Sequence, residues 1–521
     1  MKNLTNLSLH GLTTMGTALM MLATGCSQKG ASQQSATPEI SYAASFDTTN
    51  HYIDVDMQVS NINADSLVLK LPVWAPGYYL IVDFPKNVTD FQALNGGGDT
   101  IGWKKHGKTE WIVSTKGEES ITAKYRVFAD ERSVAESRVN DSVAFVAPNG
   151  VFMYLDGQKD LPSEVTFTLP ETWKSASSGL KRVDDGASNL VTFHSENADM
   201  LYDSPLLFGN HKIVKFDNDG KQYEIAMETP DGFEETTLVD DLKKMMSAAG
   251  EMIGEIPYDN YCYILLGAGG GGLEHTNSQA DYTSGSFRFK DRADYMNFLS
   301  FLTHEYFHNY NVKRIRPIEL GPFDYDKENY TPMLWVSEGF TVYYESNLLK
   351  KAGLVDGDYV LDEMAGYIKT IESKNGHKHM SLRQSSYDIW LNFFNRNANG
   401  DDVRISYYNM GPILGLLMDI EIRRMTGNEK SLDDVMRALY TKYYKEAQRG
   451  FTEEEFWQTC QDVAGQPLTE MRRYVDTTDE IDYDKALGYA GLKLDRENWK
   501  LVRLDNVNES QRKIRESLIG D

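Results

Sequence analysis

The stretch His304-Glu-Tyr-Phe-His308 carries the strongest indication of fold and function in this sequence. It lies in a run from Tyr295 to Val312 whose apolar residues recur at helical spacing. Two histidines four residues apart lie on one face of a helix, so both imidazoles can bind one metal ion while Glu305 lies beside them. The pattern is typical of a zinc site in which the glutamate acts as general base.

A catalytic zinc ion needs a third protein ligand and one open position for water. Glu338 is the candidate, in the predicted helix Leu334-Trp-Val-Ser-Glu-Gly-Phe-Thr-Val-Tyr-Tyr-Glu345. Alone it could be a solvated surface charge, but its apolar and aromatic neighbours indicate burial, and a buried carboxylate needs a cation or another partner. Glu345 lies seven residues later on the same face, where it can support a metal ligand.

These stretches resemble the glycyl aminopeptidase family of zinc metallopeptidases, which shares its catalytic core with thermolysin. The resemblance is carried by His304 to Pro317, Leu320 to Tyr325, Trp335 to Phe340, Gly271 to His275 and Trp74-Ala-Pro-Gly-Tyr78. It implies one zinc ion per chain on His304, His308 and Glu338, and peptide hydrolysis with Glu305 as base. Members of the family commonly carry a C-terminal PDZ domain, but too few residues follow Leu494 for one, so we expect none here.

A glycine-rich segment, Gly269-Gly-Gly-Gly-Leu-Glu-His275, follows a predicted strand at Tyr261 to Leu266. A phosphate-binding loop is excluded because no Lys-Ser or Lys-Thr pair follows it. The resemblance implies a strand along the substrate cleft, in which Glu274 receives the free amino group and Gly272 and His275 contribute to binding. Such a carboxylate would pair with an α-ammonium and bring the first carbonyl to the metal. The alternative is a turn with a surface acid.

Cleavage also needs a donor for the oxyanion that forms on the carbonyl. Ile405-Ser-Tyr-Tyr-Asn-Met-Gly411 resembles the Tyr-x-Lys-Gly stretch of related aminopeptidases, where the tyrosine faces the tetrahedral intermediate. We expect Tyr408 to act here. Met410 replaces the usual lysine, and Tyr407 or simple core packing of both tyrosines remain alternatives.

The remaining chain predicts a multidomain α+β protein. Short segments with alternating apolar and polar residues predict an N-terminal antiparallel β-sandwich at 40–210, with a hairpin turn at Asp217 to Gly220. A thermolysin-like α/β catalytic domain at 211–350 and a helical C-terminal part of the catalytic unit at 351–485 follow, with a tail at 486–521. We expect Lys313, Arg314 and Arg316 to form structural ion pairs, and the loop residues His377 and His379 to bind no metal.

The first residues are typical of a bacterial lipoprotein: Lys2, a mostly apolar or small run, and Ala23-Thr-Gly-Cys26. We predict a signal peptide at 1–25 and a lipidated Cys26 with a flexible tether at 26–39. The protein would then be exported and membrane-anchored, facing the periplasm or the cell surface. Cys262 and Cys460 are too few for a disulfide framework, and whether they pair is left open.

A formal net charge of −24 disfavours nucleic acid as a partner, because it repels phosphate backbones. The sequence therefore predicts a zinc aminopeptidase that acts on peptides with a free N-terminus, and the resemblance implies a preference for glycine or alanine there. Two alternatives stay open: an endopeptidase with the same zinc chemistry, and a surface binding protein whose metallopeptidase fold no longer catalyses.

Overall fold

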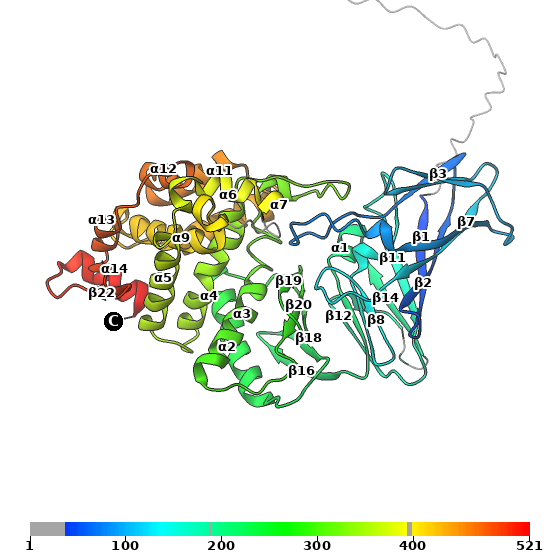
Figure 1. Ribbon diagram of the computed structural model, residues 1–521, viewed down its shortest axis with the longest axis horizontal. Helices are drawn as coiled ribbons and strands as arrows, with labels where there is room; N and C mark the ends of the chain where they lie inside the picture. The colour runs from blue at the N-terminus through cyan, green and yellow to red at the C-terminus, as the bar shows by residue number, and fades with distance from the viewer. Residues whose placement is uncertain (1–36, 185, 187–188, 393–398, 521) are drawn as a thin grey trace, which may run out of the picture. The chain divides into compact units, whose positions relative to one another are not determined.

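The computed structural model describes residues 37–184, 186, 189–392 and 399–520 (Figure 1). The described residues belong to one compact unit that begins at Thr37, and the domain boundaries predicted within it stay predictions. The predicted signal peptide and Cys26 lie outside the described residues.

Three sheets form the N-terminal region, drawn from blue to cyan in Figure 1. The first has the strand order β13 (Lys181–Arg182), β14 (Leu190–Ser195), β11 (Ser163–Thr168), β1 (Glu39–Asp47), β2 (Tyr52–Ser60), β7 (Ser120–Phe128), β4 (Val88–Asn95). The second has the order β10 (Tyr154–Leu155), β3 (Ser66–Lys70), β6 (Glu110–Ser114), β5 (Trp103–His106). The third has the order β12 (Ser175–Ser178), β15 (Leu206–Gly209), β9 (Val143–Val146), β8 (Arg138–Val139). Short helices connect them: η1 (Phe84–Asn87), η2 (Pro148–Gly150) and α1 (Ala198–Tyr202).

Alternation along the strands builds this β-rich region. In β2, Ile53, Val55, Met57 and Val59 are buried while the residues between them face outward. The β-rich N-terminal region that the sequence predicts is confirmed, with one difference: β1 pairs with β11 in parallel, not antiparallel. Alternation predicts which face of a strand is buried, but it carries no information on the direction of a partner far along the chain.

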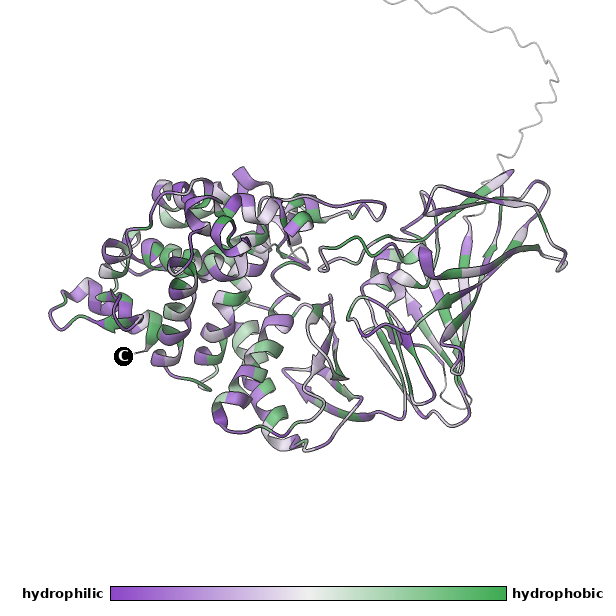
Figure 2. Ribbon diagram, in the orientation of Figure 1, coloured by the Kyte–Doolittle hydropathy of each residue, from purple (hydrophilic) through white to green (hydrophobic). Residues whose placement is uncertain are grey.

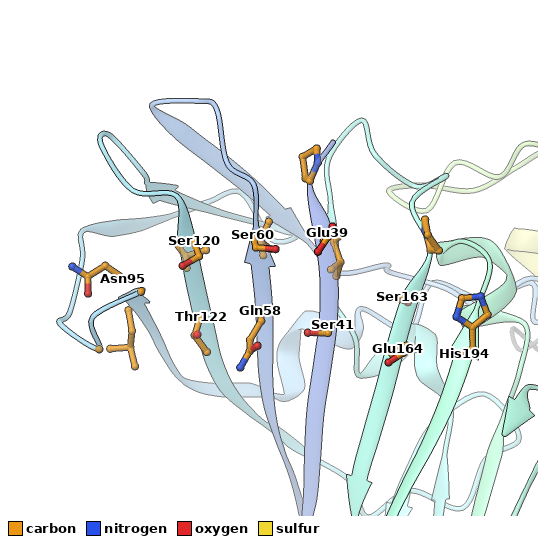
Figure 3. Close-up of a pocket in the computed structure, with 18 residues that line it drawn as sticks. Glu39, Ser41, Gln58, Ser60, Asn95, Ser120, Thr122, Ser163, Glu164 and His194 are labelled. Carbon is orange, nitrogen blue, oxygen red and sulfur yellow. The ribbon is translucent and has the colours of Figure 1, made fainter. Parts of the chain in front are cut away.

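The outward face of the seven-stranded sheet is polar. A hollow of about 750 Å³ lies over it, lined by side chains such as Ser41, Gln58 and Thr122 (Figure 3). These three residues are direct neighbours across β1, β2 and β7. None of the predicted zinc ligands is among the described residues that line this hollow.

A five-stranded sheet begins the next region, in the order β16 (Lys212–Asn218), β17 (Lys221–Met227), β18 (Asn260–Ala268), β20 (Ser278–Thr283), β19 (Gly272–Glu274). Asn218 pairs with Lys221 across a turn in which Asp219 and Gly220 both have positive φ, which confirms the predicted hairpin. Helix α2 (Glu235–Ile253) connects β17 to the parallel strand β18, and β19 lies antiparallel to β20 at the sheet edge.

Strand β18 joins two hydrophobic cores. Tyr261, Tyr263 and Leu265 face the core of the helical region, whereas Cys262 and Ile264 face the core of the β-rich region. Cys460 lies in the helical core, so Cys262 and Cys460 are buried on different sides of the sheet and are both free thiols.

Helices dominate from α3 (Arg292–Phe307) onward, drawn from green to red in Figure 1. After α3 come η3 (Ile318–Leu320), the π-helix η4 (Trp335–Gly339), α4 (Phe340–Lys351), α5 (Gly357–Glu372), η5 (Gly376–Lys378), α6 (Leu382–Tyr387), α7 (Ile389–Asn392) and α8 (Gly400–Val403). Then follow α9 (Tyr407–Met425), α10 (Leu432–Leu439), the π-helix η6 (Tyr440–Glu446), α11 (Glu453–Ala464), α12 (Thr469–Asp476), α13 (Tyr483–Gly488), the hairpin β21 (Leu492–Asp495) with β22 (Lys500–Arg503), and α14 (Glu509–Ile519).

Both helical stretches predicted around the metal ligands are present, as α3 and as η4 followed by α4. Helix α9 begins at Tyr407, where the Ser406 side chain accepts a hydrogen bond from the Tyr408 N–H and caps the helix, and Pro412 lies inside it. Hydrophobic and hydrophilic residues alternate along the helices (Figure 2), and none of the described helices is long and apolar enough to cross a membrane.

Candidate active site

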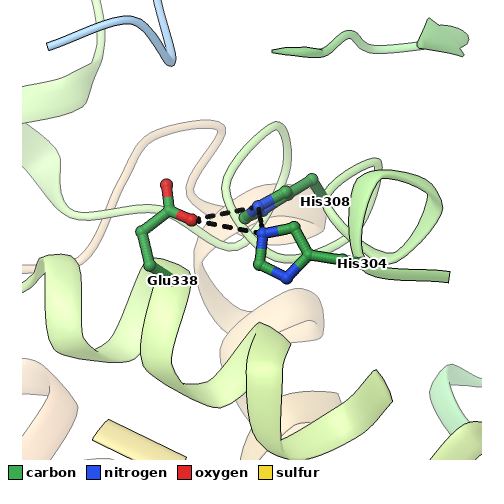
Figure 4. A group of neighbouring side chains, drawn as sticks. All are labelled: His304, His308 and Glu338. Carbon is green, nitrogen blue, oxygen red and sulfur yellow. Dashed lines mark hydrogen bonds and ion pairs between the residues drawn. The ribbon is translucent and has the colours of Figure 1, made fainter. Parts of the chain in front are cut away.

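Helix α3 brings the two histidines of the motif together. Its last turn carries His304, and His308 follows as the C-cap residue, still in helical conformation. Their Nε2 atoms are 3.0 Å apart. Glu338 comes from η4, and its Oε2 atom lies 3.2 Å from Nε2 of His308 and 3.6 Å from Nε2 of His304 (Figure 4). The three predicted ligands therefore converge, all of them largely buried.

The Nδ1 atoms of both imidazoles, which face away from Glu338, each lie within hydrogen-bond distance of an oxygen acceptor. Nδ1 of His304 lies 2.6 Å from Oε1 of Glu345, and Nδ1 of His308 lies 2.7 Å from the backbone oxygen of Asn311. A carbonyl oxygen can only accept, so His308 carries its proton on Nδ1, and a carboxylate favours the same tautomer in His304. Both Nε2 atoms then present lone pairs to the point that Glu338 also faces.

This donor set fits a zinc ion. Two lone pairs and a carboxylate that face one another repel unless a cation lies between them, and two imidazoles with one carboxylate are ligands of a catalytic zinc site. Burial raises the pKa of the Glu338 carboxyl, but positive charge beside it, on protonated His308 and His304 or on a metal ion in their place, holds the pKa well below its usual range. The Glu338 carboxyl is therefore ionised, as a metal ligand would have to be.

A loop and a π-helix set the position of Glu338. The Asn311 side chain, just after the zinc motif, donates to the backbone oxygens of Val336 at 2.8 Å and Ser337 at 3.0 Å. These bonds join the end of α3 to η4. The wider π-helical turn is a local irregularity of the kind found at functional sites, and it carries Glu338 toward the histidines.

A pocket of about 270 Å³ opens on these ligands. It is lined by Gly77, Tyr78, Arg132, Ser133, Val134, Gly270, Gly271, Gly272, Glu274, His304, Glu305, His308, Glu338 and Tyr408. Glu305 is largely buried, and burial raises the pKa of its carboxyl well above the usual range against the opposing effect of His304.

Gly272 on β19 lies directly against Glu305. A Cβ atom at this position would collide with Oε1 of Glu305 and lie 2.8 Å from Oδ1 of Asp281. Only a glycine leaves the Glu305 carboxylate in its present place, so Gly272 shapes the pocket by having no side chain.

Glu274 is the second carboxylate of the pocket and is 4% exposed. Its oxygen lies within 4.8 Å of ligand atoms on Glu305 and His308. Gly77, from the N-terminal region, covers it: a Cβ there would lie 2.6 Å from Oε1 of Glu274. Lys313 Nζ is 3.9 Å from the same Oε1, which has no hydrogen-bond partner among the described residues.

The structure does not bring His275 into the pocket. Its Nδ1 atom contacts Oδ1 of Asp203 at 3.1 Å, and Lys313 contacts the same carboxylate oxygen at 2.8 Å. Burial raises the pKa of Asp203, but Lys313 and His275 hold it well below its usual range. His275 and Lys313 thus form a buried ion-pair cluster behind Glu274.

Tyr408 lines the pocket, whereas its neighbour Tyr407 is not among the lining residues. The rings of Tyr408 and His304 are 6.2 Å apart. Helix α9, which carries Tyr408, approaches η4, which carries Glu338, through a contact between two glycines. A Cβ on Gly411 would lie only 2.6 Å from the Cα of Gly339, so the absence of side chains at both positions allows this approach.

Three further residues at the site were not predicted from the sequence. The Tyr79 hydroxyl donates to Oε1 of Glu338 at 3.4 Å, Arg132 lines the pocket from the N-terminal region, and Asp281 lies beside Gly272. Tyr79 directly follows Trp74 to Tyr78, a stretch that carried the family resemblance and could have indicated it. Arg132 and Asp281 lie in stretches without a motif.

Within the described residues, neither His377 nor His379 belongs to a group that could hold a metal ion. Lys313 forms the ion pair that was expected of it, but Arg314 and Arg316 form none with any described residue.

Fold and site together define a metallopeptidase of the zinc type. A model of the M61 peptidase N-terminal domain matches residues 41–210, and a model of the M61 glycyl aminopeptidase matches residues 297–414. Together the two matches span more than half of the chain. The protein belongs to the M61 glycyl aminopeptidase family. This membership, together with the donor set of His304, His308 and Glu338, implies zinc as the metal.

Solved structures share the fold. A crystal structure of an aminopeptidase N family protein from Idiomarina loihiensis is 26% identical, with a TM-score of 0.82, covering 87% of this chain and 78% of that chain. An M1 zinc metallopeptidase from Deinococcus radiodurans is 14% identical, with a TM-score of 0.52 and coverage of 85% and 94%. Legionella pneumophila aminopeptidase A, solved with aspartic acid, is 13% identical, with a TM-score of 0.52 and coverage of 84% and 49%. No curated protein sequence matches the chain.

Proposed function

We propose that the protein is a zinc aminopeptidase that removes N-terminal glycine or alanine from peptides, with one zinc ion per chain on His304, His308 and Glu338. One observation carries the proposal: the carboxylate of Glu274 lies in the same pocket as these ligands and within 4.8 Å of His308 and Glu305. A free α-ammonium can pair with Glu274 while the adjacent carbonyl lies at the metal ligands.

Lys313 leaves Glu274 available for this role. At 3.9 Å from Oε1 of Glu274, its ammonium is too far away to take the place of a hydrogen-bonded partner. Its own ammonium is engaged by Asp203. Oε1 of Glu274 has no hydrogen-bond partner among the described residues, so it is available to a substrate ammonium.

A bound zinc ion supplies a polarised carbonyl and a more acidic water. Glu305 accepts the proton of the attacking water on its carboxylate and passes it to the nitrogen of the leaving amine. Tyr408 donates its hydroxyl proton in a hydrogen bond to the oxyanion. Glu345 and the Asn311 carbonyl hold both imidazoles with Nε2 toward the ion, and Gly272 keeps the space that Glu305 needs.

The closed space behind Glu274 supports a preference for small N-terminal residues. The cavity there is about 10 Å³ and is walled by Trp74, Pro76, Tyr79, Val312, Leu320 and Phe323. A cavity of this size has room for little more than one water molecule, so a large side chain could not enter on this side without moving the wall.

The test is a pair of substrates, glycine p-nitroanilide and its N-acetylated form, with the Glu274→Gln variant and Glu429→Gln, an exposed glutamate, as control. Removing the charge removes a charge-assisted hydrogen bond, so we expect Glu274→Gln to raise KM at least about tenfold for the free amine. Zinc content should stay unchanged. Equal cleavage of the acetylated substrate by the wild-type protein would identify an endopeptidase instead.

We further propose that the protein is exported and anchored by a lipid on Cys26, facing the periplasm or the cell surface. The composition of the first residues supports this, as described above. Mass spectrometry of the protein from a bacterial membrane fraction should find an acylated Cys26 as the first residue. An intact Met1 or an unmodified Cys26 would contradict the proposal.

A further inference from the structure

A second pocket, of about 490 Å³, lies next to the loop that follows the zinc motif. It is lined by Glu255, Pro257, Lys313, Arg314, Arg316, Tyr444, Lys445, Gln448 and Arg449. Five of these residues are cationic and one is acidic, in a chain whose net charge is −24. Such a concentration of positive charge is unusual for a strongly acidic protein, and it needs a partner.

Three of the cations have a carboxylate partner. Lys445 contacts Glu255 at 2.7 Å, Arg449 contacts Glu455 at 2.7 Å, and Lys313 contacts Asp203 at 2.8 Å. In these three pairs the positive charge of the cation is balanced by a carboxylate.

Arg314 and Arg316 lack such partners among the described residues. Arg314 is 5% exposed and donates only to backbone oxygens, those of Thr276, Asn309 and Pro257, while its Nε has no acceptor. No hydrogen bond or ion pair of the half-buried Arg316 side chain is present in the described part of the chain. Burial lowers the pKa of Arg316, and Asp199 and Asp203 act on it only from beyond ion-pair distance.

Both guanidinium groups are nevertheless fixed in place. Arg316 lies over the ring of Phe323, 5.7 Å from its centroid, and its guanidinium fills the space where a Cβ on Gly321 would be. Arg314 lies 5.8 Å from the ring centroid of Tyr444. A fixed guanidinium loses little side-chain entropy when it binds an oxyanion, and its donors match the geometry of phosphate and carboxylate.

We propose that this pocket is a binding site for a small-molecule oxyanion, a phosphate or a carboxylate, with Arg316 as its main ligand. The anion supplies the negative charge that Arg316 lacks and the acceptors for its donors. The guanidinium nitrogens of Arg316 are not among the buried polar atoms without a partner, so they are open to the pocket and available to an oxyanion.

Lys313 connects this pocket to the zinc pocket, since it lines the one and lies 3.9 Å from Glu274 in the other. An anion bound here would offset part of the positive potential that Lys313 exerts at Glu274. Glu274 would then attract a substrate ammonium more strongly. Phosphate should therefore lower KM for glycine p-nitroanilide. This effect rests on the proposed function, whereas binding of the anion does not.

Isothermal titration of the zinc-loaded protein with inorganic phosphate, at constant ionic strength set with sodium chloride, tests the site without any substrate. We expect one site per chain, with affinity at least tenfold weaker in Arg316→Gln and unchanged in Arg288→Gln, a control at an exposed arginine paired with Asp231. Glutarate in place of phosphate identifies the ligand class: the anion whose binding depends on Arg316 is the class the pocket accepts.

Two outcomes would overturn the proposal. The first is no binding of either anion to the wild-type protein. The second is binding that Arg316→Gln leaves unchanged, which would assign the anion to the metal or to another surface. Circular dichroism and zinc content of Arg316→Gln ensure that a lost signal does not come from an unfolded variant.

Discussion

Nδ1 of His304 lies 2.6 Å from Oε1 of Glu345, a residue of α4 one helix away from the zinc motif. Ser300, one turn earlier on α3, donates to the other oxygen of the same carboxylate at 3.1 Å. Glu345 is thus held by α3 itself and fixes the direction in which His304 presents Nε2. We therefore expect the geometry of the proposed zinc site to depend on this contact as well as on the ligands.

Replacing Glu345 should therefore weaken zinc binding without removing a ligand. In Glu345→Gln the amide fixes the His304 tautomer less strongly and lowers the basicity of the imidazole. We expect zinc affinity to fall about 10- to 100-fold, measured by competition with a chelator. Glu429→Gln, at an exposed glutamate, serves as the control. Wild-type affinity in Glu345→Gln would contradict the supporting role.

Gly272 and Gly270 provide a matched pair of pocket glycines. A Cβ at 272 would collide with Glu305, whereas a Cβ at 270 would meet nothing within 4 Å. We expect Gly272→Ala to lower kcat by at least about tenfold with zinc retained, because the general base is displaced from its position. Gly270→Ala should stay within about twofold of the wild type. Equal kcat for the two variants would show that Gly272 does not set the position of Glu305.

Gly77 and Gly98 form a second pair, with φ of +90° and +88°. Alanine is strained at both, but only at 77 would it press on Glu274, at 2.6 Å, while 98 is open. We expect Gly77→Ala to raise KM for a free-amine substrate several-fold and Gly98→Ala to affect stability alone. Steady-state kinetics beside thermal unfolding midpoints separates the two effects. A KM raised equally in both variants would assign the effect to strain.

His211 gives the protein a stability that depends on pH. Burial lowers the pKa of its imidazole from 6.5 to about 4. The unfolded chain therefore binds a proton between these values that the folded protein does not, so the free energy of unfolding falls as pH falls through this window. The loss from about pH 7.5 to about pH 5 is on the order of 2 kcal/mol.

Urea unfolding at the two pH values measures this loss. In His211→Gln it should shrink by that amount, and in His106→Gln, at an exposed histidine, it should not change. An unaltered pH dependence in His211→Gln would place its origin elsewhere.

Much of the metal centre could be predicted from the sequence because its parts are local. The spacing of His304 and His308 fixes their common face on any helix, and the apolar surroundings of Glu338 indicate its burial. Alternation likewise indicated the buried faces of β2 and the β-rich N-terminal region.

Other parts depend on contacts between distant segments. The parallel pairing of β1 with β11, the approach of α9 to η4 through Gly339 and Gly411, and the reach of Tyr79 to Glu338 leave no periodic pattern in the sequence. His275 shows the converse. Its adjacency to Glu274 suggested a role in the pocket, but β19 ends at Glu274 and the His275 side chain contacts Asp203 instead.

The most direct test of the account measures zinc content and hydrolysis of glycine p-nitroanilide together, in the wild-type protein and Glu305→Gln. The account predicts one zinc ion per chain in both proteins and a kcat at least about 100-fold lower in Glu305→Gln, because only the proton acceptor is lost. Unchanged kcat in a zinc-loaded Glu305→Gln variant would contradict the role of Glu305 and the zinc aminopeptidase mechanism with it.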